Sequence, residues 1–145
     1  MSQNASFDLR EFTPYLLAQA AEMSSLGFQR YYKARYAMLR TEWRALFHLG
    51  RYGAMTSKTI CDRAHIHKTK VSRAVKALEA KRFLTRAQVE HDRRNEMLDL
   101  TGAGRAAYRD LCDRACDFDA ALLSDFSDDE IAILRRCLTR IARFD

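Results

Sequence analysis

The stretch His67-Lys-Thr-Lys-Val-Ser-Arg-Ala-Val-Lys-Ala-Leu-Glu-Ala-Lys-Arg82 decides the fold of this 145-residue chain. It holds six basic residues and one acidic residue, Glu79, whereas the whole chain carries a net charge of +6. At about 100° per residue, Val71, Val75 and Leu78 fall on one side of a helix. The other side presents hydroxyl groups and cations: Thr69, Ser72, Arg73 and Lys76. The pattern predicts a helix that follows His67, runs to about Lys81 and is buried on its aliphatic side.

The exposed side of this helix suits the major groove of duplex DNA. Serine and threonine approach phosphates and base edges closely, and arginine can donate two hydrogen bonds to guanine. A solvated amphipathic helix is the commoner meaning of a lysine-rich face. The neighbours favour the DNA interpretation, because Thr56 caps a short helix that ends near Ala64, a tight link over residues 64–67 follows, and a basic hairpin comes after the helix.

The hairpin is indicated by a change of period after Arg82, where two short strands flank the charged turn His91-Asp-Arg-Arg-Asn95. A basic tip of this kind lies beside the minor groove, whose negative potential attracts arginine. We expect Arg94 to enter that groove, Asp92 to hold it by a charge-assisted hydrogen bond, and Arg93 to contact phosphate. The complete predicted DNA-binding set is Lys68, Thr69, Lys70, Ser72, Arg73, Lys76, Arg82, Arg86, Asp92, Arg93 and Arg94.

Longer helices flank this region. The first begins at Thr13-Pro14, with Thr13 as its N-cap, and runs to about Tyr36; another extends from Thr41 to near Gly53. Thr101 caps a long helix with heptad-like spacing, and a capping box, Ser127 to Glu130, begins the last one. Apolar stripes on these last two helices need a partner surface, which a second copy of the chain would cover.

The predicted fold is therefore mainly α with a small β-hairpin wing. We expect a winged helix-turn-helix lobe for DNA binding over residues 41–100. An N-terminal dimerisation helix lies within residues 1–40, and C-terminal dimerisation helices lie within residues 101–145. All of these parts are expected to pack as one compact unit that forms a homodimer.

Composition limits where in the cell the protein is expected and which class of partner it binds. A net charge of +6 favours an acidic partner, either nucleic acid or an anionic membrane face. Residues 1–10 do not read as a signal peptide, and no stretch approaches the roughly 18 apolar residues of a membrane span. We therefore expect a cytoplasmic protein without a membrane partner. Its cysteines, Cys61, Cys112, Cys116 and Cys137, are then expected to be thiols.

An ordered set of motifs resembles the MarR family (multiple antibiotic resistance regulators). It comprises Thr41-Glu-Trp-Arg-Ala-Leu46, Ile66-His-Lys-Thr-Lys-Val-Ser-Arg73, Leu78-Glu-Ala-Lys81, Asp92-Arg-Arg94, Leu98-Asp-Leu-Thr-Gly-Ala-Gly-Arg105 and the stretch over residues 122–130. The resemblance implies a transcription regulator, a homodimer that binds a pseudo-palindromic operator as a repressor or, less often, as an activator. It also implies that a small aromatic or other anionic effector enters a crevice between the dimer helices and the DNA-binding lobe and releases DNA.

One departure from the family pattern concerns the backbone. The family often has glycine at the end of the predicted DNA-binding helix, where this chain has Arg82. If the backbone there is left-handed, arginine costs on the order of 1 kcal/mol.

Aromatic side chains indicate where an effector would bind. Candidates for the pocket are Phe28, Tyr31, Tyr32, Arg35, Trp43, Phe47 and His48, with Arg30 or Arg35 as the partner of a carboxylate. Each aromatic residue taken alone is more often core or dimer interface. Together they predict a pocket for an aromatic acid or an acyl conjugate.

Three alternatives come from other classes of protein. Cys61, near Arg63 and His65, is the one candidate for a redox sensor. A winged helix can also serve purely as a protein–protein assembly module. An enzyme is disfavoured, because the chain has no ordered Ser/His/Asp set, glycine-rich phosphate loop or HExxH motif. We expect no cofactor and no metal site, since Cys61 and His65 alone are too few ligands for zinc.

Overall fold

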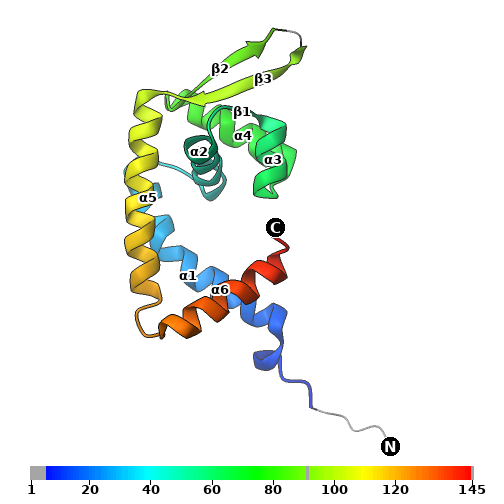
Figure 1. Ribbon diagram of the computed structural model, residues 1–145, viewed down its shortest axis with the longest axis vertical. Helices are drawn as coiled ribbons and strands as arrows, with labels where there is room; N and C mark the ends of the chain where they lie inside the picture. The colour runs from blue at the N-terminus through cyan, green and yellow to red at the C-terminus, as the bar shows by residue number, and fades with distance from the viewer. Residues whose placement is uncertain (1–5, 91, 145) are drawn as a thin grey trace, which may run out of the picture.

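The computed structural model describes residues 6–90 and 92–144, and it describes residues 92–94 by their backbone alone. In chain order the elements are η1 (Leu9–Glu11), α1 (Thr13–Tyr36), α2 (Arg40–Tyr52), β1 (Met55–Thr56), α3 (Ser57–Ala64), α4 (Lys68–Ala80), β2 (Leu84–Val89), β3 (Asp92–Leu100), α5 (Gly102–Leu122) and α6 (Asp128–Ala142). Figure 1 shows α2, α3, α4 and the sheet gathered at one end, α1 and α6 at the other, and α5 along the side between them. This is the predicted winged-helix arrangement.

The sheet is antiparallel and has the strand order β1-β3-β2. The predicted hairpin is confirmed, with Leu84 opposite Leu100 and a register shift between Gln88 and Val89, but β3 already begins at Asp92, inside the stretch expected as the turn. Strand β1 was not expected, because two residues, Met55 and Thr56, are too short to show a period of two. It pairs Met55 with Leu98 and so joins the start of α3 to the wing.

The core of the lobe lies between α2, α3, α4 and the sheet. On α4 the aliphatic residues Val71, Ala74, Val75 and Leu78 are buried, as the helical pattern predicted. They join the largest fully buried side chains of the neighbouring elements, which are Leu46, Leu49, Ile60, Leu98 and Leu111. Burial of such a side chain contributes about 1.5–3 kcal/mol, so this cluster fixes how α4 is rotated about its own axis.

Three of the predicted helix caps are confirmed. The side-chain oxygens of Thr56, Thr101 and Ser127 each accept a hydrogen bond from the backbone N–H group three residues further on. Glu130 completes the capping box at the start of α6 by accepting the N–H group of Ser127.

Two helix starts differ from prediction. The N-cap of α1 is Phe12, so Thr13 lies inside the first turn, beside Pro14. Helix α2 begins one residue before Thr41, with Leu39 as its N-cap. The side chain of leucine has no oxygen that could accept a hydrogen bond from the helix. Instead the carboxylate of Glu42, inside the first turn, accepts the N–H group of Leu39.

Helix α5 approaches the lobe closely at two glycines. A Cβ atom on Gly50 would lie 2.4 Å from the ring of Tyr108, and one on Gly104 would lie 2.0 Å from the carbonyl oxygen of Phe83. That carbonyl also accepts the N–H group of Thr101 at 3.0 Å. The start of α5 is therefore packed directly on the segment that follows α4.

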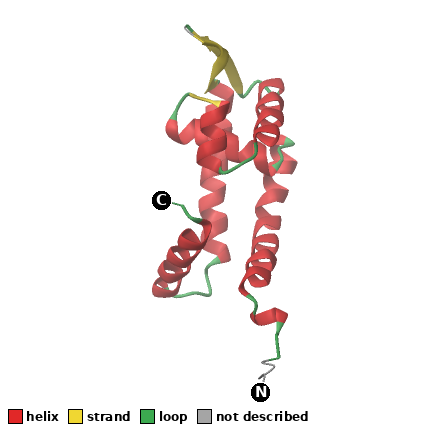
Figure 2. Ribbon diagram, turned by 90° about the vertical axis from the view of Figure 1, so that its right-hand side faces the viewer, coloured by secondary structure: helices red, strands yellow, loops and turns green. Residues whose placement is uncertain are grey.

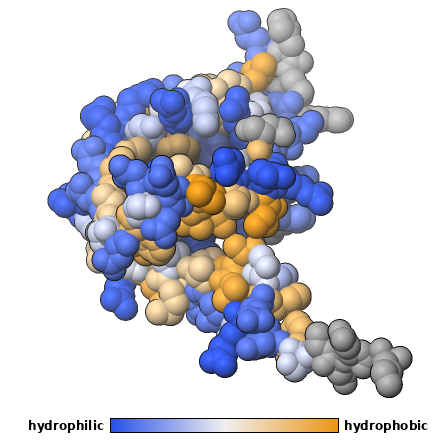
Figure 3. Space-filling model, turned by 60° about the horizontal axis from the view of Figure 1, so that its bottom comes forward, coloured by the Kyte–Doolittle hydropathy of each residue, from blue (hydrophilic) through white to orange (hydrophobic). Residues whose placement is uncertain are grey.

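The far end of the molecule exposes apolar side chains. Helix α6 turns back from the end of α5 toward the lobe (Figures 1 and 2), and the ring of its following residue Phe144 lies 5.4 Å from that of His65. Figure 3 shows hydrophobic side chains gathered near the middle of the face at this end. The exposed large hydrophobic residues of α1 and α6 are Leu16, Met23, Leu26, Ile133, Leu134, Leu138 and Ile141.

Across the described part of the chain, no helix combines the length and the apolar character that a membrane crossing requires.

We predict that Gly104→Ala destabilises the fold by about 1–3 kcal/mol, because the new methyl group must displace backbone rather than a flexible side chain. Urea unfolding measures the change. Gly102→Ala is the matched control in the same helical turn, since a Cβ atom there meets nothing within 4 Å. Equal stability of the Gly104 variant and the wild type would contradict the close approach.

Candidate nucleic-acid interface and adjoining pocket

The polar side of α4 is open to solvent. All six predicted positions on this helix are exposed: Lys68, Thr69, Lys70, Ser72, Arg73 and Lys76. Because the buried side of the same helix is fixed by the core, these side chains form one continuous ridge of hydroxyl groups and cations. In shape and charge the ridge suits the major groove of DNA.

The start of α4 is organised by the residue that precedes it. His67 is the N-cap, and its Nδ1 atom accepts the N–H group of Thr69 at 3.2 Å. An accepting Nδ1 atom carries no proton, so the cap requires the neutral ring. The N-terminus of α4 is the positive end of the helix dipole, and Lys68 and Lys70 lie in its first turn. Both features make this end of the ridge attractive to phosphate.

The end of α4 has the expected left-handed residue. Arg82 has a φ of 63°, so the left-handed conformation considered for this position is the one that the backbone adopts. Its carbonyl oxygen accepts a hydrogen bond from the hydroxyl of Thr101 at 2.7 Å, which offsets part of the strain. The side chain of Arg82 is exposed and free to reach outward from the end of the helix.

The wing differs from the expectation of freely projecting cations. Arg86 donates to Glu79 through Nε at 2.9 Å and to Glu96 through Nη1 at 3.2 Å. Two carboxylates therefore offset its charge, which makes it a weaker candidate for a phosphate contact than the cations of α4. The side chains of Asp92, Arg93 and Arg94 lie outside the described residues, so their assignment stays a prediction.

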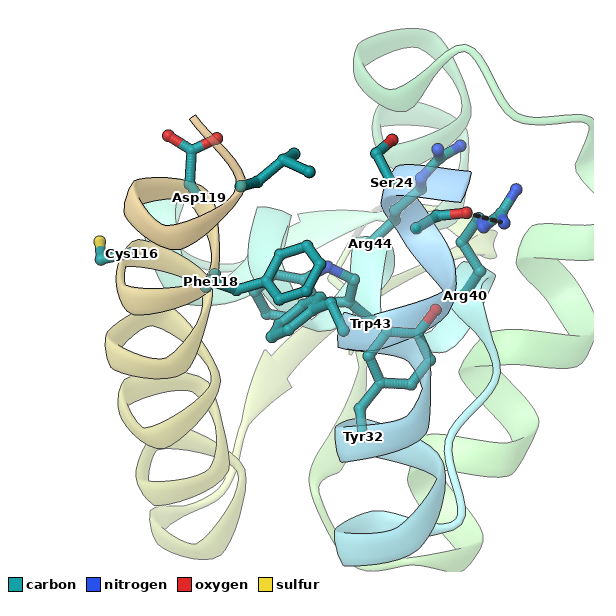
Figure 4. A pocket seen from close by; sticks show the side chains of 12 residues that line it. Ser24, Tyr32, Arg40, Trp43, Arg44, Cys116, Phe118 and Asp119 are labelled. Atoms are coloured by element: carbon teal, nitrogen blue, oxygen red, sulfur yellow. Dashed lines mark hydrogen bonds between the residues drawn. The ribbon is translucent and has the colours of Figure 1, made fainter. Parts of the chain in front are cut away.

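A cavity of about 510 Å³ opens between α1, α2 and α5 (Figure 4). Its lining is Ser24, Ser25, Phe28, Tyr32, Arg40, Trp43, Arg44, Ala115, Cys116, Phe118, Asp119 and Leu122. Phe28 lies at the centre of the aromatic wall, with ring centroids 5.5 Å from Trp43 and 5.8 Å from Phe118. Such a wall suits a flat apolar group, because offset and edge-to-face contacts stabilise aromatic pairs.

The cations of this cavity are not the predicted ones. Arg40 and Arg44 line it, and the predicted Arg30 and Arg35 do not. The guanidinium of Arg40 donates to the hydroxyl of Ser25 at 3.0 Å, drawn as a dashed line in Figure 4. The spacing of Arg40, Trp43 and Arg44 places all three on one side of α2, a signal in the sequence that could have identified them.

Of the predicted aromatic set, only Phe28, Tyr32 and Trp43 line the cavity. Phe47 packs instead toward Tyr108, with ring centroids 6.2 Å apart, and His48 Nδ1 lies 2.7 Å from the carbonyl oxygen of Arg44. Tyr31 and Arg35 do not line the cavity and have other partners. The hydroxyl of Tyr31 donates to Asp110, and the guanidinium of Arg35 lies over the ring of Tyr36.

Two tyrosines of α1 share one carboxylate of α5. The hydroxyl groups of Tyr36 and Tyr31 donate to Asp110 Oδ2 at 2.5 and 2.7 Å. These two bonds lower the pKa of Asp110, that from Tyr36 having the larger effect. Burial, together with the bond to Asp110, raises the pKa of Tyr36 to about 12. The network fastens the end of α1 to the middle of α5, below the lobe.

The cysteines are free thiols. Cys61 and Cys112 are half-buried, whereas Cys116 and Cys137 are exposed. Burial raises the pKa of the Cys112 thiol, which makes that thiol less reactive. A redox role for Cys61 stays a prediction. Within the described ranges no cluster of three or more His, Cys, Asp or Glu side chains could hold a metal ion.

Comparisons with known proteins agree with this geometry. A family model described as "MarR family" matches residues 38–95. The chain is 28% identical over 95 residues, 66% of its length and 69% of the relative, to an uncharacterised HTH-type transcriptional regulator, YwoH, of Bacillus subtilis strain 168.

Solved structures share the fold over almost the whole chain. BpsR of Bordetella bronchiseptica, described with the regulation of its DNA binding by 6-hydroxynicotinic acid, has a TM-score of 0.88 at 19% identity, over 97% of this chain and 100% of that one. The MarR family regulator SPO1453 of Silicibacter pomeroyi has a TM-score of 0.77 at 26% identity, over 94% of this chain and 99% of that one. YwoH and SPO1453 are both described as transcriptional regulators.

We predict that Asp110→Asn destabilises the fold at neutral pH by about 1–2 kcal/mol, because both tyrosine hydroxyls lose a charged acceptor. A carboxyl whose pKa is lowered on folding stabilises the protein above its unfolded pKa, near 3.8, and loses this effect as the pH falls through its folded pKa. In urea unfolding the difference between wild type and variant should be constant from about pH 7 to 5 and shrink below about pH 4. Asp113→Asn, an exposed carboxyl on the same helix, is the control. A difference that does not change down to pH 3 contradicts this role.

Proposed function

We propose that this chain is a transcription regulator of the MarR family that represses transcription by binding a pseudo-palindromic operator as a homodimer. The observation that carries the proposal is the ridge on α4, whose exposed cations and hydroxyl groups are held outward by the buried side of the same helix. We call α4 the recognition helix from here on. In this proposal it enters the major groove, Arg73 reads a guanine, and Lys68, Lys70 and Lys76 bind phosphates.

The homodimer is supported by the exposed apolar side chains of α1 and α6. Leu134, Leu138 and Ile141 recur along one side of α6 at spacings of three and four residues, and they are 39%, 40% and 55% exposed. A water-exposed stripe of this kind is costly unless a second surface covers it. A second copy that covers the stripe would hold two recognition helices on one duplex, which is why a two-fold operator is expected.

The effector response is supported by the cavity between α1, α2 and α5. Its wall of Phe28, Trp43 and Phe118 suits an aromatic ring, and Arg40 and Arg44 suit a carboxylate. The description of BpsR, whose DNA binding responds to 6-hydroxynicotinic acid, agrees with a small aromatic acid as effector here. The effector would bind between the dimer helices and the lobe and weaken binding to DNA.

We predict that two substitutions on the recognition helix have different effects on DNA binding. Duplexes selected from a random pool are bound at several salt concentrations and the dissociation constants are measured. Lys76→Ala should weaken all sequences alike and lower the salt slope by about one, because one phosphate contact is lost. Arg73→Ala should cost about 1–3 kcal/mol and relax the preference at one base position.

Lys33→Ala, an exposed lysine of α1, is the control and should change neither quantity. Sedimentation of the complex should give two chains per duplex. If Arg73→Ala keeps the full sequence preference, Arg73 does not read a base. Retention of no duplex at low salt would leave only the alternative of a protein-assembly module.

A further inference from the structure

The first turn of α2 lies between the cavity and the recognition helix. Arg40, Trp43 and Arg44 line the cavity, as Figure 4 shows. Leu39, Thr41 and Glu42 face the other way and line a smaller hollow together with recognition-helix residues, which are Lys70, Arg73, Ala74 and Ala77. One turn of helix thus contacts both the proposed effector site and the proposed DNA-reading element.

Glu42 is the most constrained residue of this turn. It is only 3% exposed and is the one charged residue among the buried side chains of the described chain. Each carboxylate oxygen has a separate partner: one accepts the N–H group of Leu39, and the other accepts Lys81 Nζ at 2.9 Å. Lys81 is the C-cap of the recognition helix. The carboxylate therefore ties the start of α2 to the end of the recognition helix.

This ion pair resists separation, because the Glu42 carboxylate is buried and the Lys81 side chain is only 25% exposed. Separating its partners would leave the carboxylate of Glu42, whose side chain is 4% exposed, without its cation at a site that water hardly reaches, which is strongly unfavourable. When α2 shifts, Lys81 must therefore follow Glu42, or the pair must break. The ion pair between Glu79 of the recognition helix and Arg86 of β2 cannot act in this way. Both of its side chains are substantially exposed, and it makes no link to α2.

We infer that the Glu42–Lys81 ion pair couples occupation of the cavity to the placement of the recognition helix. This inference rests on the proposed function, since it assumes that the recognition helix binds DNA and that an anion binds at Arg40 and Arg44. An anion in the cavity competes with the hydroxyl of Ser25 for Arg40, which loosens the bond between α1 and the first turn of α2 and lets that turn shift. Glu42, two residues further on, then carries Lys81 with it. Glu42 and Lys81 are positioning residues, because neither lines the cavity or lies on the ridge.

The test uses a tethered occupant, so it does not depend on the identity of the effector. Ser24 lines the cavity, and Ser24→Cys is made in a background with Cys116→Ser and Cys137→Ser, which removes the two exposed thiols. The new thiolate attacks 2-sulfonatoethyl methanethiosulfonate, a mixed disulfide forms and methanesulfinate leaves. Mass spectrometry verifies a single label, which places a sulfonate beside the two arginines. Methyl methanethiosulfonate at the same position is the uncharged control.

We predict that the sulfonate label changes the dissociation constant for a selected duplex by roughly tenfold when the ion pair is intact, a common size for coupling between two sites. With Glu42→Gln and Lys81→Met together, the same label should change it by less than about threefold. Glu79→Gln, which breaks the exposed pair, and Lys81→Arg, which keeps the buried one, should both retain the full effect. If the double variant does not fold, Lys81→Gln replaces it with the same expectation.

The result that overturns the inference is an equal effect of the label with and without the buried pair, or no effect when the pair is intact. A merely structural role would change stability or the affinity of the unlabelled protein but would leave the ratio between labelled and unlabelled protein unchanged. Failure of the proposed function is visible earlier, because the unlabelled protein with its ion pair intact would then bind no selected duplex. That outcome removes both proposals.

Discussion

Burial of one side of a single helix determines the remaining features of the interface. Val71, Ala74, Val75 and Leu78 turn toward α2, α3 and the sheet, and each larger side chain contributes about 1.5–3 kcal/mol to that packing. Exposed ion pairs contribute at most about 1 kcal/mol, so the cations on the opposite side of α4 do not decide how the helix is rotated. They are carried outward by the core, at no cost in desolvation, and stay available for a polyanionic partner.

The lobe is in turn held rigidly against α5. Gly50 and Gly104 permit contacts that any larger residue would prevent, and Thr101 both caps α5 and holds the left-handed residue Arg82 through its carbonyl oxygen. Further along α5, Asp110 gathers the two tyrosine hydroxyls of α1. The cavity lies beyond this network, where α1 and α5 diverge around the start of α2. An effector bound there would contact the first turn of α2 and not the Asp110 network.

Much of this could be predicted from the sequence, because the relevant signals are local. The period of α4, the hydroxyl caps Thr56, Thr101 and Ser127, and the left-handed position of Arg82 each depend on a few neighbouring residues. The strand β1 could not be predicted, since its two residues become a strand only by pairing with β3.

The features that were missed or misplaced depend on contacts between distant segments. Glu42 reads as an ordinary exposed helix residue until Lys81, far along the chain, is placed beside it. The neutralisation of Arg86 by Glu96 likewise depends on strand register. The cavity was misplaced for a related reason: aromatic residues signal apolar surface, but which side of α1 and α2 meets α5 decides whether Tyr31 or Tyr32 reaches the cavity.

The most direct test of the central claim is a lysine acetylation footprint of the full chain, with and without a selected DNA duplex. Lys68, Lys70 and Lys76 lie on the ridge, and Lys33 is an exposed residue of a different helix, α1. If the outward side of α4 binds DNA, the duplex slows acetylation of the three ridge lysines and leaves Lys33 unchanged. Equal acetylation of all four lysines in the presence of bound duplex would contradict the account.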